Sequence, residues 1–242
     1  MRLRLPSLLG AVTLLAMLAL GSSASAFAQA TPEASPTGGE FDLSTLPGLH
    51  LGVARLYSNP IATTQIDPNA TPADMAATPE ATPDYASWGV VTLSAIILEF
   101  DSPEQAAANM DTVNAAMTSP ASTGGIELTE VSVDGFPGPA KAYSASIDQG
   151  PGLTMHQVLL TTQDGPYIYQ VIAISLSKVE DAQGAAEKVV HAMIAAPIGE
   201  GDGTFNQDGT SSGGIWDKFP VAGDAALAGL TPNLDDRIVP AS

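Results

Sequence analysis

The residues of this chain that could carry out chemistry are few and scattered. The chain has three histidines, His50, His156 and His191, and no cysteine. The histidines form no metal-binding pattern, and no Gly-x-Ser-x-Gly turn or Gly-rich phosphate loop stands between a predicted strand and a predicted helix. The many carboxylates show no spacing that singles out an acid–base pair. The sequence therefore predicts no catalytic residue, no metal site and no cofactor, and it favours a role other than catalysis.

The polar side chains best suited to binding lie in a predicted hairpin at residues 153–176, around the turn Gln163-Asp-Gly-Pro. We expect Thr162 to pair with Tyr167 across this turn. Because side chains alternate between the two faces of a strand, His156, Tyr167 and Tyr169 then share one face. Tyrosine and histidine combine an apolar body with a polar tip, which suits a small-molecule site.

Two interpretations of this hairpin face stay open, because both faces of the hairpin are largely apolar and need cover. The face could be ordinary core, covered by the segment around Trp216 and Phe219. Alternatively it could line a ligand groove. The predicted ligand-binding residues are then His156, Tyr167 and Tyr169, with Tyr143 from the strand predicted at Ala140 to Ile147.

The first 28 residues have the three-part pattern of a secretory signal peptide. Arg2 and Arg4 precede an apolar run at residues 8–20, and Ala26-Phe-Ala fits a signal peptidase site. The run is shorter than the roughly 20 apolar residues that span a bilayer. We therefore expect a secreted or extracytoplasmic protein, cleaved near Ala28, without membrane insertion after cleavage.

The composition is strongly acidic, with a formal net charge of −18. Such a surface repels the phosphates of nucleic acids, so nucleic-acid binding is excluded. The lack of cysteine excludes a disulfide framework. The expected partner is an unknown small molecule or an extracytoplasmic protein, and the expected state is a monomer or a homodimer.

Composition also divides the chain into segments. Regions rich in threonine, proline and alanine bury little apolar surface and therefore form no core. The predicted segments are a signal peptide at 1–28, a Thr/Pro/Gly-rich linker at 29–47, a folded domain at 48–197 with a disordered excursion at 59–87, and a Gly-rich loop with a docked tail at 198–242.

The periodicity predicts an α+β domain with the element order β-β-α-β-β-β-β-α. Val90 to Phe100 is apolar on both faces and should be a central strand. Capping boxes at Ser102–Gln105 and Ser177–Glu180 should begin the two helices. Strands are predicted at 126–133 and at 140–147, around the turn Asp134–Pro139. We expect an antiparallel sheet of about six strands, both helices on one face, and an irregular tail docked on the domain.

The residues Glu99-Phe-Asp-Ser-Pro-Glu-Gln-Ala106 carry a resemblance to exported bacterial sensor-like domains. The chain resembles the extracellular sensor domains of mycobacterial Ser/Thr kinases and related secreted lipoproteins, by element order over about residues 89–197. The chain lacks the cysteines, the kinase and the anchor of such proteins, and no functional residue is transferred from them. The resemblance implies binding or sensing.

Together these observations predict an exported, soluble and non-catalytic binding or sensor-like domain. Its ligand would be a small amphipathic molecule or a protein at the cell surface. An extracytoplasmic enzyme of unknown reaction and a structural cell-envelope protein are the two alternatives.

Overall fold

The structure is a computed structural model that describes residues 45–60, 84–150, 153–200, 203 and 213–232, and the strand at 237–240. The predicted signal peptide lies outside the described residues, as do most of the linker at 29–47 and most of the excursion at 59–87. Among the described residues, no helix is both long enough and apolar enough to cross a membrane.

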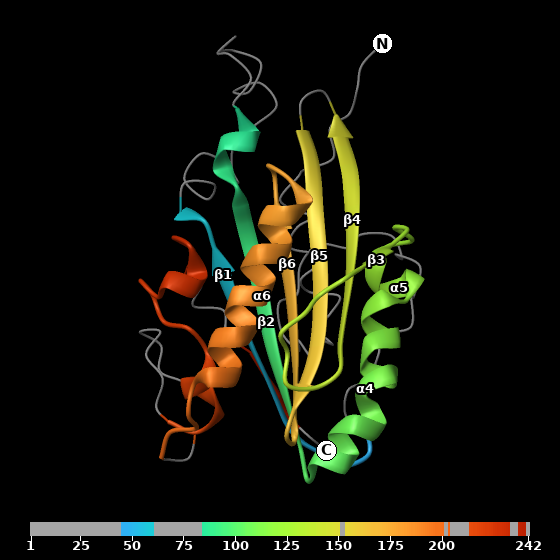
Figure 1. The fold of residues 1–242 in the computed structure, drawn as a ribbon, viewed down its shortest axis with the longest axis vertical. Helices are drawn as coiled ribbons and strands as arrows, with labels where there is room; N and C mark the ends of the chain where they lie inside the picture. The colour runs from blue at the N-terminus through green and yellow to red at the C-terminus, as the bar shows by residue number, and fades with distance from the viewer. Residues whose placement is uncertain are drawn as a thin grey trace, which may run out of the picture.

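A single antiparallel sheet forms the frame of the molecule (Figure 1). Seven strands lie side by side in the order β3-β4-β5-β6-β2-β1-β7, and β8 also pairs with β1. Their bounds are β1 Leu49–Ser58, β2 Val90–Phe100, β3 Thr129–Val131, β4 Ala140–Gly150, β5 Leu153–Asp164, β6 Tyr167–Ser175, β7 Thr231–Pro232 and β8 Arg237–Pro240.

The helices follow the predicted order, which confirms the α+β class. They are the α-helices α4 (Pro103–Thr118), α5 (Pro120–Thr123) and α6 (Val179–Ala195), and the 3-10 helices η2 (Tyr85–Trp88), η3 (Ile215–Lys218) and η4 (Ala225–Leu227). Six strands precede α6, as expected. The short strands β7 and β8 come from the C-terminal segment and raise the total above the predicted six.

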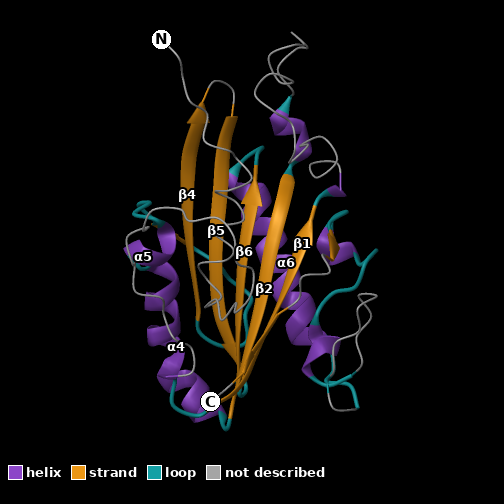
Figure 2. Cartoon of the chain, turned by 180° about the vertical axis from the view of Figure 1, so that it is seen from behind, coloured by secondary structure: helices purple, strands orange, loops and turns teal. Residues whose placement is uncertain are grey.

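The prediction that both helices cover one face of the sheet is wrong. Ala95 and Ile97 of β2 belong to the apolar cluster that contains α6, whereas Ile96 and Leu98 belong to the cluster that contains α4. Because successive side chains of a strand point to opposite faces, α4 and α6 lie on opposite sides of the sheet (Figure 2). The physical reason is the two-sided apolar character of β2, which requires cover on both faces.

One of the two predicted helix starts is confirmed. Ser102 accepts a hydrogen bond from the Gln105 backbone N–H at 3.3 Å and caps α4, with Pro103 as the first helical residue. The second is wrong, because α6 begins after Lys178, whose side chain makes no capping bond. The Ser177 hydroxyl instead donates to the Asp181 carboxylate.

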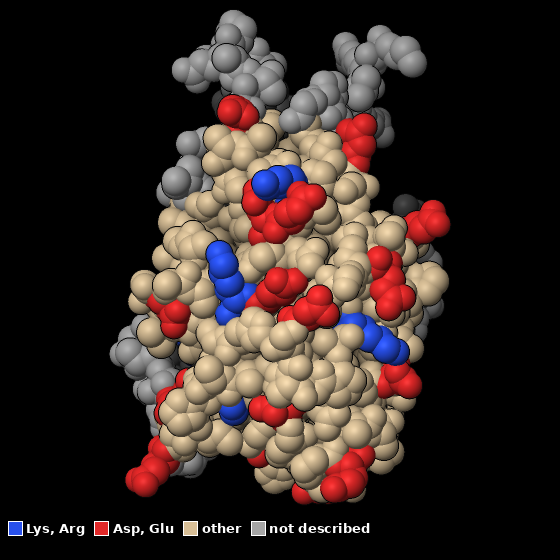
Figure 3. All heavy atoms as spheres, viewed as in Figure 1, with Lys and Arg blue, Asp and Glu red and all other residues tan. Residues whose placement is uncertain are grey.

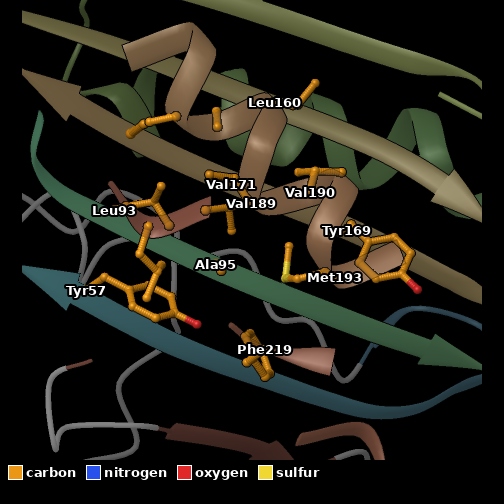
Figure 4. Packing of buried hydrophobic residues seen from close by; sticks show 14 of the residues in the cluster. Tyr57, Leu93, Ala95, Leu160, Tyr169, Val171, Val189, Val190, Met193 and Phe219 are labelled. Carbon is orange, nitrogen blue, oxygen red and sulfur yellow. The ribbon is translucent and has the colours of Figure 1, made fainter. Parts of the chain in front are cut away.

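The larger core lies between the sheet and α6 (Figure 4). Val189, Val190 and Met193 of α6 pack onto side chains of β2 and β6. Trp216 and Phe219 belong to the same cluster, and each is no more than 2% exposed. The C-terminal segment therefore docks on this face, as the sequence predicts, and completes the cover that α6 begins.

Candidate functional site

The hairpin β5–β6 places three of the four predicted binding residues on the expected face. Thr162 pairs with Tyr169, and Tyr167 pairs with Asp164. The register therefore differs by two residues from the expected pairing of Thr162 with Tyr167, and a shift of two keeps every side chain on its predicted face. His156, Tyr167 and Tyr169 share the face that α6 covers.

The fourth predicted residue, Tyr143, lies on the opposite face. It pairs with Leu159, which packs with Met117 of α4 in a separate apolar cluster. His156 is also apart from the tyrosines along the hairpin, because it pairs with Ser175 at the end of β6 away from Tyr167. The structure thus brings Tyr167 and Tyr169 together, but it does not gather the four residues into one site.

The face with Tyr167 and Tyr169 is filled by the protein itself. Tyr169 is fully buried in the cluster that includes Trp216 and Phe219. The buried Lys218 lies over both tyrosine rings, with Nζ 5.3 Å from the centre of the Tyr167 ring and 5.6 Å from that of Tyr169. A ligand cannot reach these groups without displacing the docked segment.

Lys218 anchors the docked segment to the end of α6. Its Nζ donates to the backbone carbonyls of Met193 at 3.3 Å and Ala196 at 3.1 Å. These carbonyls belong to the last turn of the helix, where acceptors lack helical partners and a cation is favoured. Burial lowers the pKa of Lys218. The arrangement is that of a structural clamp, with its charge satisfied by backbone oxygens and aromatic rings.

The two tyrosines beside Lys218 differ in their hydrogen bonding. The Tyr167 hydroxyl donates to Glu99 Oε1 at 3.3 Å, whereas the Tyr169 hydroxyl is buried and has no hydrogen-bond partner in the described part of the chain. Burial raises the pKa of Tyr169, with smaller contributions from the charges of Asp164 and Tyr167. Burial also raises the pKa of Tyr167, and the nearby Glu99 adds to the effect.

The histidines do not converge. His50 and His191 are exposed, and His191 stacks on Phe136 with the ring centres 4.5 Å apart. His156 is half-buried, with Nδ1 2.8 Å from Ser146 Oγ. Within the described ranges, no group of three or more His, Cys, Asp or Glu side chains could hold a metal ion.

A hollow of about 380 Å³ opens beside Tyr143. This volume is within the range of about 300–1,000 Å³ of small-molecule sites. The lining residues come from the ends of α4 and α5, from the following loop and from β4. They are Thr118, Pro120, Thr123, Gly125, Ile126, Glu127, Leu128 and Tyr143.

Local sequence builds the wall of this hollow. Ser119 ends α4 and caps α5, where its hydroxyl accepts from the Ser122 N–H at 3.2 Å. Gly124 and Gly125 then have φ values of 65° and 80°, a left-handed conformation that glycine adopts without strain. The chain turns here and joins the sheet only at Thr129. The strand predicted at 126–133 is therefore reduced to the three residues of β3.

The hollow combines apolar surface with a few polar groups. Ile126 and Leu128 supply apolar walls. Tyr143 Oη accepts from Asn114 Nδ2 at 3.2 Å, which leaves the tyrosine O–H to donate elsewhere. Thr123 is 4% exposed, and its Oγ1 has no hydrogen-bond partner in the part of the chain that the structure describes. Tyr143 and an apolar wall therefore border one space, whereas the Thr123 hydroxyl itself is buried in the protein.

Glu127 adds a charge to the lining. Its side chain is exposed, and it forms no ion pair with any described residue. A carboxylate in this position favours a ligand whose polar end is neutral or cationic.

Of the lining residues, the sequence prediction included only Tyr143. The others were missed because the hollow is assembled from a helix end, a short turn and a strand edge. The signal that could have revealed the turn is Ser119-Pro120, a serine cap followed by proline, with Gly124-Gly125 as the stop.

Comparisons of the chain with protein-family models, with curated proteins and with solved structures found no match. The resemblance to exported sensor domains therefore stays a prediction.

Proposed function

We propose that this chain is an exported, non-catalytic binding domain and that it takes a small amphipathic ligand in the hollow beside Tyr143. The observation that carries the proposal is a hollow of about 380 Å³ that combines apolar walls with Tyr143 and the exposed Glu127. Sites for small molecules are typically such concave, largely apolar spaces with a few polar groups that orient the ligand.

The lining defines the chemistry of this ligand. Ile126 and Leu128 favour an aromatic or branched apolar group. The Tyr143 hydroxyl can donate one hydrogen bond to the polar end of the ligand. Glu127 favours an ammonium group over a carboxylate. A small aromatic amine satisfies all three requirements.

The sequence supports an extracytoplasmic place of action. The signal-peptide pattern at 1–28 and the acidic surface are both typical of exported soluble proteins. Acidic side chains are scattered across the face that carries α6 and do not gather over a single element (Figure 3). This distribution favours a role in solubility over recruitment of a cation by the surface as a whole.

The proposal is tested by titrating the full chain with phenethylamine and recording backbone amide shifts by NMR. The expected result is a saturable shift of the Gly125, Leu128 and Tyr143 amides. Tyr143→Phe should weaken binding at least tenfold, whereas Thr123→Val, which changes a buried hydroxyl, should leave binding nearly unchanged. Phenylacetate, which has the same ring and the opposite charge, should bind more weakly. Absence of saturable shifts at these amides, or equal binding to Tyr143→Phe, would contradict the proposal.

A further inference from the structure

The outer edge of β4 is only partly covered. β3 has three residues, and its pairing with the eleven-residue β4 ends at Thr129 opposite Ser144. On its inner side, β4 pairs with β5 along its whole length, apart from a register irregularity near Gly150. From Ala145 onward, no strand among the described residues lies on the outer side, and this part of β4 extends beyond β3 and α5 (Figure 1).

The uncovered edge can accept another strand. Backbone N–H and C=O groups of alternate residues point outward from the edge of an antiparallel sheet, and they pair readily with an additional strand. Proteins usually block such edges with proline, with lysine or with a short strand. Residues 145–148, Ala-Ser-Ile-Asp, contain neither proline nor lysine.

The side chains along this edge leave room for an incoming backbone. Ala145 is small and buried, Ser146 is small and exposed, and Ile147 is half-buried. Ile147 packs near Met155 and Trp88 on the α4 side of the sheet, which offers an apolar contact to one side chain of an added strand. Among the described residues, these side chains leave the edge sterically open, and its apolar surface is small.

The charge near the β4 edge determines which kind of added strand is favoured. The exposed Glu127 lies just before β3, where the covered part of the edge ends. The lysine of β4, Lys141, is paired with Asp111 at 2.8 Å. A second copy of this chain would bring another net charge of −18 to the contact. The negative charge that repels a second copy attracts a cationic segment.

We infer that the β4 edge at Ala145–Asp148 is a docking strand for an extended, lysine- or arginine-containing segment of a partner polypeptide, which adds antiparallel to β4 in line with β3. Main-chain hydrogen bonds supply the attachment, and the basic side chains lie toward Glu127. Glu127 also borders the hollow, but the main-chain contacts along β4 do not depend on the ligand proposed there.

The probe is an acetylated and amidated heptapeptide of alternating lysine and valine, mixed with the full chain. Amide hydrogen exchange measured by NMR should show new protection at alternate residues of 145–148. The same peptide with N-methyl groups on every second residue keeps its charge but loses the donors on one edge. It should bind at least tenfold more weakly. A glutamate–valine peptide should also bind at least tenfold more weakly than the lysine–valine peptide.

A pair of variants with the same change of charge locates the contact. Ser146→Lys places a cation on the edge and should weaken binding of the lysine–valine peptide at least tenfold. Ala195→Lys, at the exposed end of α6, should change it less than twofold. Denaturant unfolding of both variants checks that the fold is retained.

Three results would overturn the inference. Equal binding of the N-methylated peptide would show that charge alone holds the probe. Equal weakening by the two lysine variants would show that the contact is not at β4. Protection of 145–148 that rises with protein concentration in the absence of peptide, together with a dimer in sedimentation, would assign the edge to a second copy of the chain.

Discussion

The two faces of the sheet each bury a hydroxyl group without a hydrogen-bond partner among the described residues, but the surroundings of these groups differ. On the α6 face, the Tyr169 hydroxyl lies under the docked segment that carries Trp216 and Lys218. On the α4 face, Thr123 Oγ1 is equally inaccessible, but the residue borders an open hollow. The comparison teaches that an unsatisfied buried polar atom does not by itself indicate a binding site, which needs an accessible space as a separate observation.

The largest expected effect is on the closed face. Trp216→Ala should lower the free energy of unfolding by about 3–5 kcal/mol, because it empties a large buried volume between α6 and the sheet. Urea unfolding followed by circular dichroism measures the change. Trp88→Ala is the control, because Trp88 is only half-buried and should cost clearly less. A loss in Trp216→Ala as small as that in Trp88→Ala would mean that the docked segment contributes little to stability.

Removal of the Tyr169 hydroxyl should raise the free energy of unfolding rather than lower it. Tyr169→Phe keeps the ring and deletes a buried group without a partner, so stability at neutral pH should rise by about 1 kcal/mol. The folded-state pKa of Tyr169 is raised above its ordinary value of 10.0. Ionisation of Tyr169 therefore leaves the free energy of unfolding unchanged below about pH 10 and lowers it as the pH rises further, because the unfolded chain releases the proton first.

Unfolding measured between pH 8 and pH 11 separates this contribution from the others. The wild-type protein should lose stability above about pH 10, and Tyr169→Phe should lose less. Lys218 changes the free energy of unfolding in the opposite direction. Its pKa is lowered in the folded state, so the folded chain loses this proton before the unfolded chain does, and stability rises as the pH approaches 10.5. A wild-type profile and a Tyr169→Phe profile that run parallel would show that the hydroxyl is not buried in solution.

The hollow should respond in ligand binding more than in stability. Thr123→Val replaces a buried hydroxyl by a methyl group of similar size, so the free energy of unfolding should rise by less than about 1 kcal/mol. Phenethylamine binding should be nearly unchanged in this variant and should fall at least tenfold in Tyr143→Phe. Thermal unfolding with and without the amine measures both quantities. Strong destabilisation would indicate that the Thr123 hydroxyl is satisfied inside the protein.

The smallest effect is expected at the exposed ion pair between Lys141 and Asp111. Hydrogen bonding and the charge of Lys141 lower the pKa of Asp111, but both side chains are solvated and the pair is screened. Asp111→Asn should leave the free energy of unfolding unchanged within measurement error. A clear loss would show that this pair holds α4 against β4.

Local signals account for the parts of the fold that could be predicted. Ser102 followed by Pro103 satisfies the helix start within one turn, and Val90 to Phe100 requires a central position because it is apolar on both faces. The second helix start failed because Asp181, four residues after Ser177, takes the Ser177 hydroxyl that the cap would use. The sequence shows Asp181 as a possible acceptor. Local propensity, however, does not decide whether the Ser177 hydroxyl caps the helix or bonds to this carboxylate.

The candidate site was predicted less well. Tyr143 was included among the binding residues, but its grouping with His156, Tyr167 and Tyr169 required all four to share a face. The pairing of Tyr143 with Leu159 places it on the other side. The face of a strand depends on its register with neighbouring strands, and a one-residue difference reverses every side chain.

By itself, the sequence determined the class of the domain, the order of its elements and the apolar character of both sheet faces, because hydrophobic periodicity and turn residues act over a few neighbouring positions. Only the tertiary structure decided which helix covers which face, which tyrosine the Trp216 segment buries, and where a hollow stays open. These outcomes depend on contacts between segments far apart in the chain, such as the hydrogen bond from Tyr57 to Pro220, and no local pattern specifies such a pairing.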